Sequence, residues 1–163
     1  MRNSKVKGFT LVELIVVIAI IAILAAILVP SMLAYIKNAR YTQADANAKN
    51  VHTAATAALA QAYVDGDLGS AGGAGNNVAV LDSSLQATVG SATIDLADEL
   101  GGTQSFKGTG AFHYDGSTYS VISAAWAQTS GALSNWNGTV PSASDRETAT
   151  NIIGYYPAPK KGS

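Results

Sequence analysis

The chain has 163 residues, a formal net charge of −1 and no cysteine. This length leaves room for one globular domain beyond an anchoring segment. Without cysteine the protein can form neither a disulfide framework nor a thiolate metal site. Residues 1–8 hold three of the ten lysine and arginine residues and none of the eleven acids, so the rest of the chain is acidic and lacks the basic cluster of a nucleic-acid-binding protein.

Residues 9–29 form an apolar run, FTLVELIVVIAIIAILAAILV, in which Thr10 and Glu13 are the only polar residues. A helix of this length measures roughly 31 Å, which matches the hydrocarbon core of a bilayer. A carboxylate in such a helix costs about 2.5–3.5 kcal/mol, whereas each surrounding aliphatic residue returns about 0.3–0.6 kcal/mol. The run is therefore expected to span a membrane despite Glu13, with the basic N-terminus on the cytoplasmic side.

Two simpler interpretations of this run explain less. A cleaved secretory signal has an apolar region of about 7–15 residues without an acid, followed by a small-residue cleavage site. Here residues 14–29 alone are apolar without interruption, and Pro30 follows. A plain single-pass anchor accounts for neither Glu13 nor the junction between Gly8 and Phe9.

The junction KGFTLVEL at residues 7–14, with a short basic leader before it and an apolar helix after it, resembles the processing and assembly signature of type IV prepilins and pseudopilins. The resemblance implies that residues 1–8 are a leader peptide, removed by a prepilin peptidase that cuts after Gly8 on the cytoplasmic side. It also implies that the new amine of Phe9 is methylated. Because glycine has no side chain, Gly8 suits a narrow protease cleft.

The helix is expected to continue from Phe9 to Val64. Pro30 lacks a backbone donor and clashes with the preceding turn, so a kink or a local break is expected there. Beyond it, apolar residues recur at three- and four-residue spacing, which is typical of an amphipathic helix packed on its own domain. These residues are Leu33, Ile36, Val51, Ala55, Ala58, Leu59 and Ala62. The turn at residues 65–67 is then expected to end the helix.

The remaining residues predict a small mixed domain. Residues 68–75 have the composition of a flexible loop, and residues 81–89 and 93–100 are each predicted as a short helix, the second ending near residues 98–102.

A hairpin is predicted over residues 110–123 around a two-residue turn, Asp115-Gly116. A third strand is predicted over residues 150–156, ended by Pro157.

The expected fold class is therefore α+β. A long N-terminal helix, transmembrane in its first half and amphipathic in its second, packs on a small C-terminal antiparallel sheet, as the pilin resemblance also implies. The expected organisation is a leader at residues 1–8, a transmembrane and assembly helix at residues 9–30 and an extracytoplasmic domain at residues 31–163.

No residue pattern points to catalysis, a metal or a cofactor. His52 and His113 are far apart and lack the spacing of a metal motif, and His52 is expected on a solvated helix face. The turn at residues 65–67 resembles part of a calcium loop but lacks its later bidentate glutamate, so a plain helix-ending turn is favoured. Asn137-Gly138-Thr139 fits a glycosylation sequon and a turn, and the turn is favoured. An enzyme is not expected.

Four aromatic residues of the C-terminal region are expected in the domain core rather than on an adhesive surface. They are Trp126, Trp136, Tyr155 and Tyr156.

The functional hypothesis is a structural subunit of a type IV pilus, which polymerises with copies of itself through the N-terminal helix and serves adhesion, motility or DNA uptake. The alternatives are a pseudopilin of a type II secretion or competence system and, third, a monomeric membrane-tethered binding module. The partners implied by the resemblance are the prepilin peptidase, an inner-membrane assembly platform and, before assembly, membrane lipid. The expected location is a single-pass membrane protein with its C-terminus outside, and then an extracellular pilus.

Glu13 distinguishes these hypotheses, because a tethered module gains nothing from a carboxylate in the membrane. Two roles are possible for it. Glu13 can neutralise the N-terminus of its own helix. Alternatively, it can pair with the amine of Phe9 on a neighbouring subunit, which is the favoured interpretation.

Overall fold

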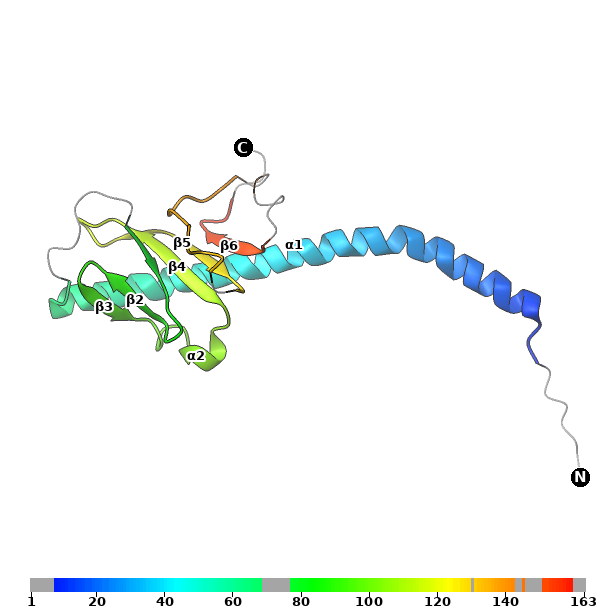
Figure 1. The fold of residues 1–163 in the computed structure, drawn as a ribbon, viewed down its shortest axis with the longest axis horizontal. Helices are drawn as coiled ribbons and strands as arrows, with labels where there is room; N and C mark the ends of the chain where they lie inside the picture. The colour runs from blue at the N-terminus through cyan, green and yellow to red at the C-terminus, as the bar shows by residue number, and fades with distance from the viewer. Residues whose placement is uncertain (1–7, 69–76, 130, 143–144, 146–150, 160–163) are drawn as a thin grey trace, which may run out of the picture. The chain divides into compact units, whose positions relative to one another are not determined.

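The computed structural model describes residues 8–68, 77–129, 131–142, 145 and 151–159 (Figure 1). The fold is α+β, as predicted: a long N-terminal helix is followed by a small antiparallel sheet. The chain divides into two compact units, Met1–Ala39 and Arg40–Ser163. Most of the predicted leader, the predicted loop after Leu68 and the first residue of the predicted third strand lie outside the described residues.

The helix α1 runs from Leu11 to Asp65 and confirms the predicted long helix. It stays helical through Pro30, so a local break does not occur there, while a kink at this position remains a prediction. At its end, Gly66 has a φ of 79°, a left-handed conformation that glycine adopts readily. This conformation lets the backbone N–H of Asp67 donate to the carbonyl of Ala62 at 3.1 Å, which closes the last turn and confirms the predicted stop.

In the second unit, α1 buries one face, and most of the buried residues are alanines. The buried residues are Tyr41, Ala44, Ala48, Val51, Ala54, Ala55, Ala58, Leu59 and Ala62. The last five predicted positions of the amphipathic face are therefore confirmed. The first two are wrong, because Leu33 and Ile36 are 62% and 37% exposed. They lie in the first unit, where no described residue of α1 is buried.

The main sheet has four antiparallel strands in the order β1-β4-β5-β6. They are β1 (Asn77–Val80), β4 (Thr109–Tyr114), β5 (Val121–Ala127) and β6 (Ile153–Tyr156). The pair β4–β5 confirms the predicted hairpin, and β6 confirms the predicted third strand. The strand β1 was not predicted, because four residues after a glycine-rich stretch show too little alternation to be recognised.

The connection between β4 and β5 is longer than the predicted two-residue turn. Asp115 organises a loop of residues 115–120, in which its Oδ1 accepts from the backbone N–H groups of Ser117 at 2.8 Å and Thr118 at 3.0 Å. Its own N–H donates to the carbonyl of Ser120 at 2.9 Å. Tyr119, predicted within a strand, has a φ of 54° in this loop. The carboxylate replaces the hydrogen bonds that a tight turn would have supplied.

The two short helices predicted between residues 81 and 100 are wrong. The structure instead has a two-stranded antiparallel sheet of β2 (Gln86–Val89) and β3 (Ala92–Asp95). Its turn uses Gly90, with a φ of 62°, and its strands contain β-branched residues that suit a sheet. The predicted helix end near residue 100 is also wrong, because this stretch forms a turn that leads into the short helix α2 (Gly102–Ser105).

Both faces of the main sheet are covered. One face packs on α1, in a core that contains Leu59, Phe112 and Trp126. The other face packs under the segment 131–140, in a second cluster that includes Leu133 and Tyr155. Trp126 and Tyr155 are each 8% exposed and Trp136 and Tyr156 are half-buried, which confirms the predicted core placement of these aromatic residues.

The strand β6 lies against the backbone of α1. A Cβ atom on Gly154 would overlap the carbonyl group of Ala44, so only glycine permits this approach. Beside it, Asp45 accepts a hydrogen bond from the backbone N–H of Tyr155 at 3.0 Å through its Oδ1. Asp45 thereby satisfies a donor on the edge strand that would otherwise be left without a strand partner.

Candidate functional site: the capped apolar segment

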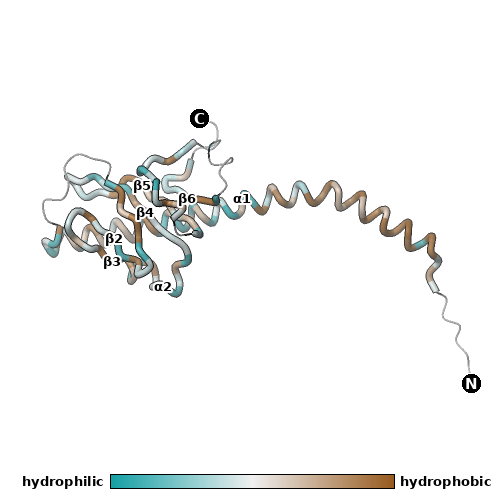
Figure 2. The backbone as a smooth tube through the Cα atoms, viewed as in Figure 1, coloured by the Kyte–Doolittle hydropathy of each residue, from teal (hydrophilic) through white to brown (hydrophobic). Residues whose placement is uncertain are grey.

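The first half of α1 is strongly hydrophobic in sequence (Figure 2). Its large apolar side chains are exposed. Phe9 is 92% exposed, Ile21 59% and Ile27 70%. By length and composition, α1 is able to cross a membrane, and its most apolar stretch has no buried residue. A soluble monomer rarely leaves so large an apolar surface in water. This segment therefore requires lipid or other protein chains around it.

The first turn of this segment is closed by a reciprocal pair of side chains. The Glu13 Oε2 atom accepts hydrogen bonds from the backbone N–H and the hydroxyl of Thr10, both at 2.8 Å. In return, the Thr10 hydroxyl oxygen accepts from the backbone N–H of Glu13 at 3.3 Å. This arrangement is a capping box, which satisfies N–H groups that a helix start leaves without a partner.

The capping box gives Glu13 a role within its own subunit. A carboxylate at a helix N-terminus also interacts favourably with the helix dipole. Both hydrogen bonds fall on Oε2, and among the described residues no donor is assigned to Oε1. The carboxylate can therefore hold the cap and still present one oxygen to a further cation.

Thr10 is the partner that the sequence interpretation missed. The sequence signal was present, because a threonine followed three residues later by a glutamate, just before an apolar run, is the pattern of a capping box.

The residues of the predicted processing site lie outside the helix. Gly8 and Phe9 precede α1, and a Cβ atom built on Gly8 has no neighbour within 4 Å. Gly8 and Phe9 are both exposed, as a protease substrate requires. Cleavage after Gly8 and methylation of Phe9 remain predictions at this accessible position.

The other candidate residues form no common site. The His52 Nε2 atom lies 3.3 Å from the carbonyl oxygen of Val121, and its ring centroid lies 4.7 Å from that of Tyr156. His52 is thus half-buried against the sheet, and its expected place on a solvated face is wrong. Among the residues that the structure describes, no group of three histidine or acidic side chains could hold a metal.

The segment around Asn137 forms the turn that its sequence favoured. The Asn137 Oδ1 atom accepts from the backbone N–H of Thr139 at 3.0 Å, and Gly138 has a φ of 84°. The Ser123 hydroxyl anchors this turn to β5 by donating to the carbonyl of Gly138 at 2.7 Å.

Comparison with known families identifies the apolar segment. A family described as "Prokaryotic N-terminal methylation motif" matches residues 3–29, a range that contains Gly8, Phe9 and the capping box. The N-terminal segment is therefore similar to the prokaryotic N-terminal methylation motif. The resemblance to prepilins is confirmed at this segment.

Two relatives are type IV pilus proteins. The chain is 64% identical over 42 residues to the type IV wide pilus major component PilA4 of Thermus thermophilus, and this match covers 26% of the chain and 30% of that protein. It is 42% identical over 52 residues to the type IV major pilin protein PilA of Myxococcus xanthus, covering 32% of the chain and 24% of that protein. The chain thus matches less than a third of the length of either relative. No solved structure matches the chain.

Proposed function

We propose that the protein is a structural subunit of a type IV pilus that polymerises through its N-terminal helix. One observation carries this proposal: an apolar helix exposed along its first half coincides with the methylation motif. The two relatives named as major pilus components support it. While the subunit is in the membrane, lipid covers this apolar surface. In the filament, the same helix of neighbouring subunits takes the place of the lipid. The subunit has no catalytic task in this role.

Each segment of the chain has a proposed role in processing, membrane insertion or filament assembly. Residues 1–8 form the cytoplasmic leader, which a prepilin peptidase removes, and Phe9 becomes the methylated N-terminus. Residues 9–30 span the membrane and later form the filament core. Residues 31–163 stay outside the membrane and become the filament surface, after an assembly platform in the membrane has extracted the subunit.

Glu13 carries the proposed assembly step. Cleavage creates an amine at Phe9 with an ordinary pKa of roughly 7.7–8, so a large fraction is cationic at neutral pH. In the single subunit Thr10 donates to Oε2 of the Glu13 carboxylate, and among the described residues no donor is assigned to Oε1. In the filament this carboxylate meets the amine of a neighbouring subunit. Removing one partner of such a buried pair costs about 3–5 kcal/mol, enough to prevent assembly.

Leader removal is tested by the intact mass of protein recovered from sheared filaments. The mass is expected to correspond to a chain that starts at Phe9 and carries one methyl group. A Gly8→Leu variant is expected to accumulate as the full-length precursor in the membrane. Mature protein that still begins at Met1 would contradict the proposal. Absence of this chain from sheared filaments that other subunits form would instead favour a pseudopilin.

Two substitutions of Glu13 separate its two roles. Glu13→Gln keeps an oxygen that accepts from Thr10 but removes the charge, whereas Glu13→Ala removes both. Both variants are expected to insert and to be cleaved after Gly8, yet to form few or no filaments when counted by electron microscopy. Filaments of normal number from the Glu13→Gln variant would show that the cap alone suffices and that the charge pair does not drive assembly.

A further inference from the structure

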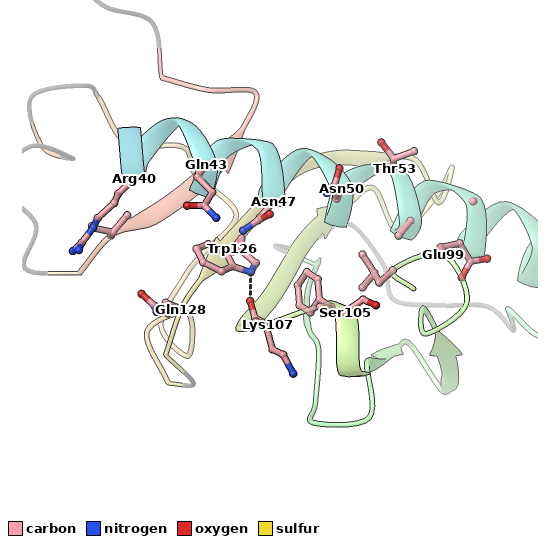
Figure 3. Close-up of a pocket in the computed structure, with 15 residues that line it drawn as sticks. Arg40, Gln43, Asn47, Asn50, Thr53, Glu99, Ser105, Lys107, Trp126 and Gln128 are labelled. Carbon is pink, nitrogen blue, oxygen red and sulfur yellow. Dashed lines mark hydrogen bonds between the residues drawn. The ribbon is translucent and has the colours of Figure 1, made fainter. Parts of the chain in front are cut away.

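The second unit contains an open groove that the proposed pilus function does not use. The groove has a volume of about 910 Å³ and runs between α1 and later residues that include 99–100, 105–107, 126 and 128 (Figure 3). This volume lies within the range of about 300–1,000 Å³ that is usual for small-molecule sites.

One wall of the groove is a row of amide side chains. Gln43, Asn47 and Asn50 follow each other at spacings of four and three residues, so they lie on one face of α1, and each lines the groove. Gln128, the residue after β5, adds a fourth amide (Figure 3). Each amide carries two donors and one acceptor oxygen, so the row can pair with groups that both donate and accept, as hydroxyl groups do.

The floor beside this row is aromatic and rigid. Trp126 is 8% exposed, and its Nε1–H donates to the backbone carbonyl of Lys107 at 3.0 Å, which fixes the orientation of the ring. Phe106, half-buried, lines the groove next to it. Apolar ring surface beside several hydrogen-bonding groups suits a ligand that is apolar on one face and polar around its edge, as a sugar ring is.

The charges of the groove exclude other classes of ligand. Glu99 lies at one end and Arg40 at the other, with Lys107 between them (Figure 3). Two separated cations and one acid do not form the basic cluster that phosphate chains or nucleic acids need. The polar amide wall equally disfavours a lipid tail. The groove is thus suited to an uncharged, hydroxyl-rich molecule.

We propose that this groove binds a neutral oligosaccharide, with its hydroxyl groups on the amide row and a ring face on the floor formed by Phe106 and the edge of Trp126. This site belongs to the second unit alone and does not depend on whether the protein forms a pilus.

The test uses the full chain in a detergent without a sugar headgroup, such as dodecylphosphocholine, so that the detergent does not compete. Maltotriose, cellotriose and chitotriose are titrated separately while the indole N–H signals of the two tryptophans are followed by NMR. At least one sugar is expected to shift the Trp126 signal in a saturable way, while Trp136, which lies outside the groove, stays unchanged.

Matched variants locate the binding. Asn47→Leu and Asn50→Leu are each expected to raise the dissociation constant by about tenfold, because each removes hydrogen bonds to the sugar. Gln104→Leu removes an exposed amide on α2 that does not line the groove. This variant is expected to bind the sugar with the same dissociation constant as the unchanged chain. An unaltered Trp136 signal in each variant shows that the domain is still folded.

Three results would overturn the proposal. The first is the absence of saturable binding by all three sugars. The second is binding that Asn47→Leu and Asn50→Leu weaken no more than Gln104→Leu does. The third is a Trp126 shift that follows protein concentration without any sugar, which would identify the groove as a contact between copies of the chain.

Discussion

The two halves of α1 differ in what surrounds them, although they form one helix. From Leu11 to Ala39 no described side chain is buried, whereas nine are buried between Arg40 and Asp65. Residues 14–30 of the first half are apolar all round, whereas the second half is apolar on one face, which the sheet covers. A helix that is apolar all round is typical of a membrane span or of the interior of an assembly. The second half is thus stabilised by contacts within the chain, and the first half by its surroundings.

The residue types in each half of α1 match these surroundings. The first half is rich in valine, isoleucine and leucine, which provide apolar surface to lipid or to other helices. The second half buries mostly alanine, which lets the sheet approach the helix backbone closely, as Ala44 and Gly154 show. Large side chains on this face would hold the strands away from the helix.

The close contact between Gly154 of β6 and the backbone of Ala44 should be the position where a substitution destabilises the domain most. Gly154→Ala is expected to destabilise the second unit by about 4–5 kcal/mol, because the new Cβ overlaps the backbone of Ala44 and cannot be relieved by a side-chain rotation. Urea unfolding of the full chain in detergent, followed by tryptophan fluorescence, measures this effect, since both tryptophans lie in the second unit.

Gly131→Ala is the control for this substitution. Unlike Gly154, Gly131 has a positive φ, of 87°, but a Cβ atom there meets nothing within 4 Å. The expected cost is only the backbone strain, about 1–2 kcal/mol. Equal destabilisation by the two substitutions would refute the close-approach argument.

A pair of truncations tests the contrast between the halves directly. Leu59→Ala, at a residue 1% exposed in the second half, is expected to cost about 2–4 kcal/mol, because it leaves a cavity under the sheet. Ile21→Ala, at a residue 59% exposed in the first half, is expected to change the same unfolding free energy by less than about 0.5 kcal/mol. A large effect of Ile21→Ala on the tryptophan transition would break the comparison, since it would mean that the first half also stabilises the domain.

The smallest expected effect concerns the loop after β4. Hydrogen bonds from the Ser117 side chain and the backbone of Thr118 lower the pKa of Asp115 to about 2. Because the pKa in the folded state lies below its unfolded value of about 3.9, the contribution to stability is present above that value. It is lost as the pH falls from about 4 to about 2.

Urea unfolding of the Asp115→Asn variant at several pH values checks this expectation. The stability difference from the unchanged chain should be largest above pH 4 and should shrink on acidification, and Ser117→Ala should show a weaker form of the same trend. Ser134→Ala is the control, because its hydroxyl donates to the carbonyl of Gly131 and to no acid. A difference that grows as the pH falls would contradict the assigned hydrogen bonds.

Structural features that depend on residues close together in the chain could be predicted from the sequence. The apolar run, the helix stop at Gly66, the hairpin strands and β6 depend on local periodicity and on turn residues, and these predictions are confirmed. The methylation motif likewise occupies one continuous stretch. Local hydrogen bonds and side-chain spacing are sufficient for such elements, so the residues themselves determined them.

Other features depend on residues far apart in the chain, and only the tertiary structure decided them. Residues 86–95 form a hairpin rather than helices, because Ala87 and Ile94 are buried in the core that α1 completes. The strand β1 exists because β4 pairs with it, and Asp45 meets the edge of β6 across 110 residues of sequence. The groove at Trp126 likewise joins the middle of α1 to two later segments. Contacts of this kind depend on the packed arrangement of the whole second unit, which periodicity within one segment does not reveal.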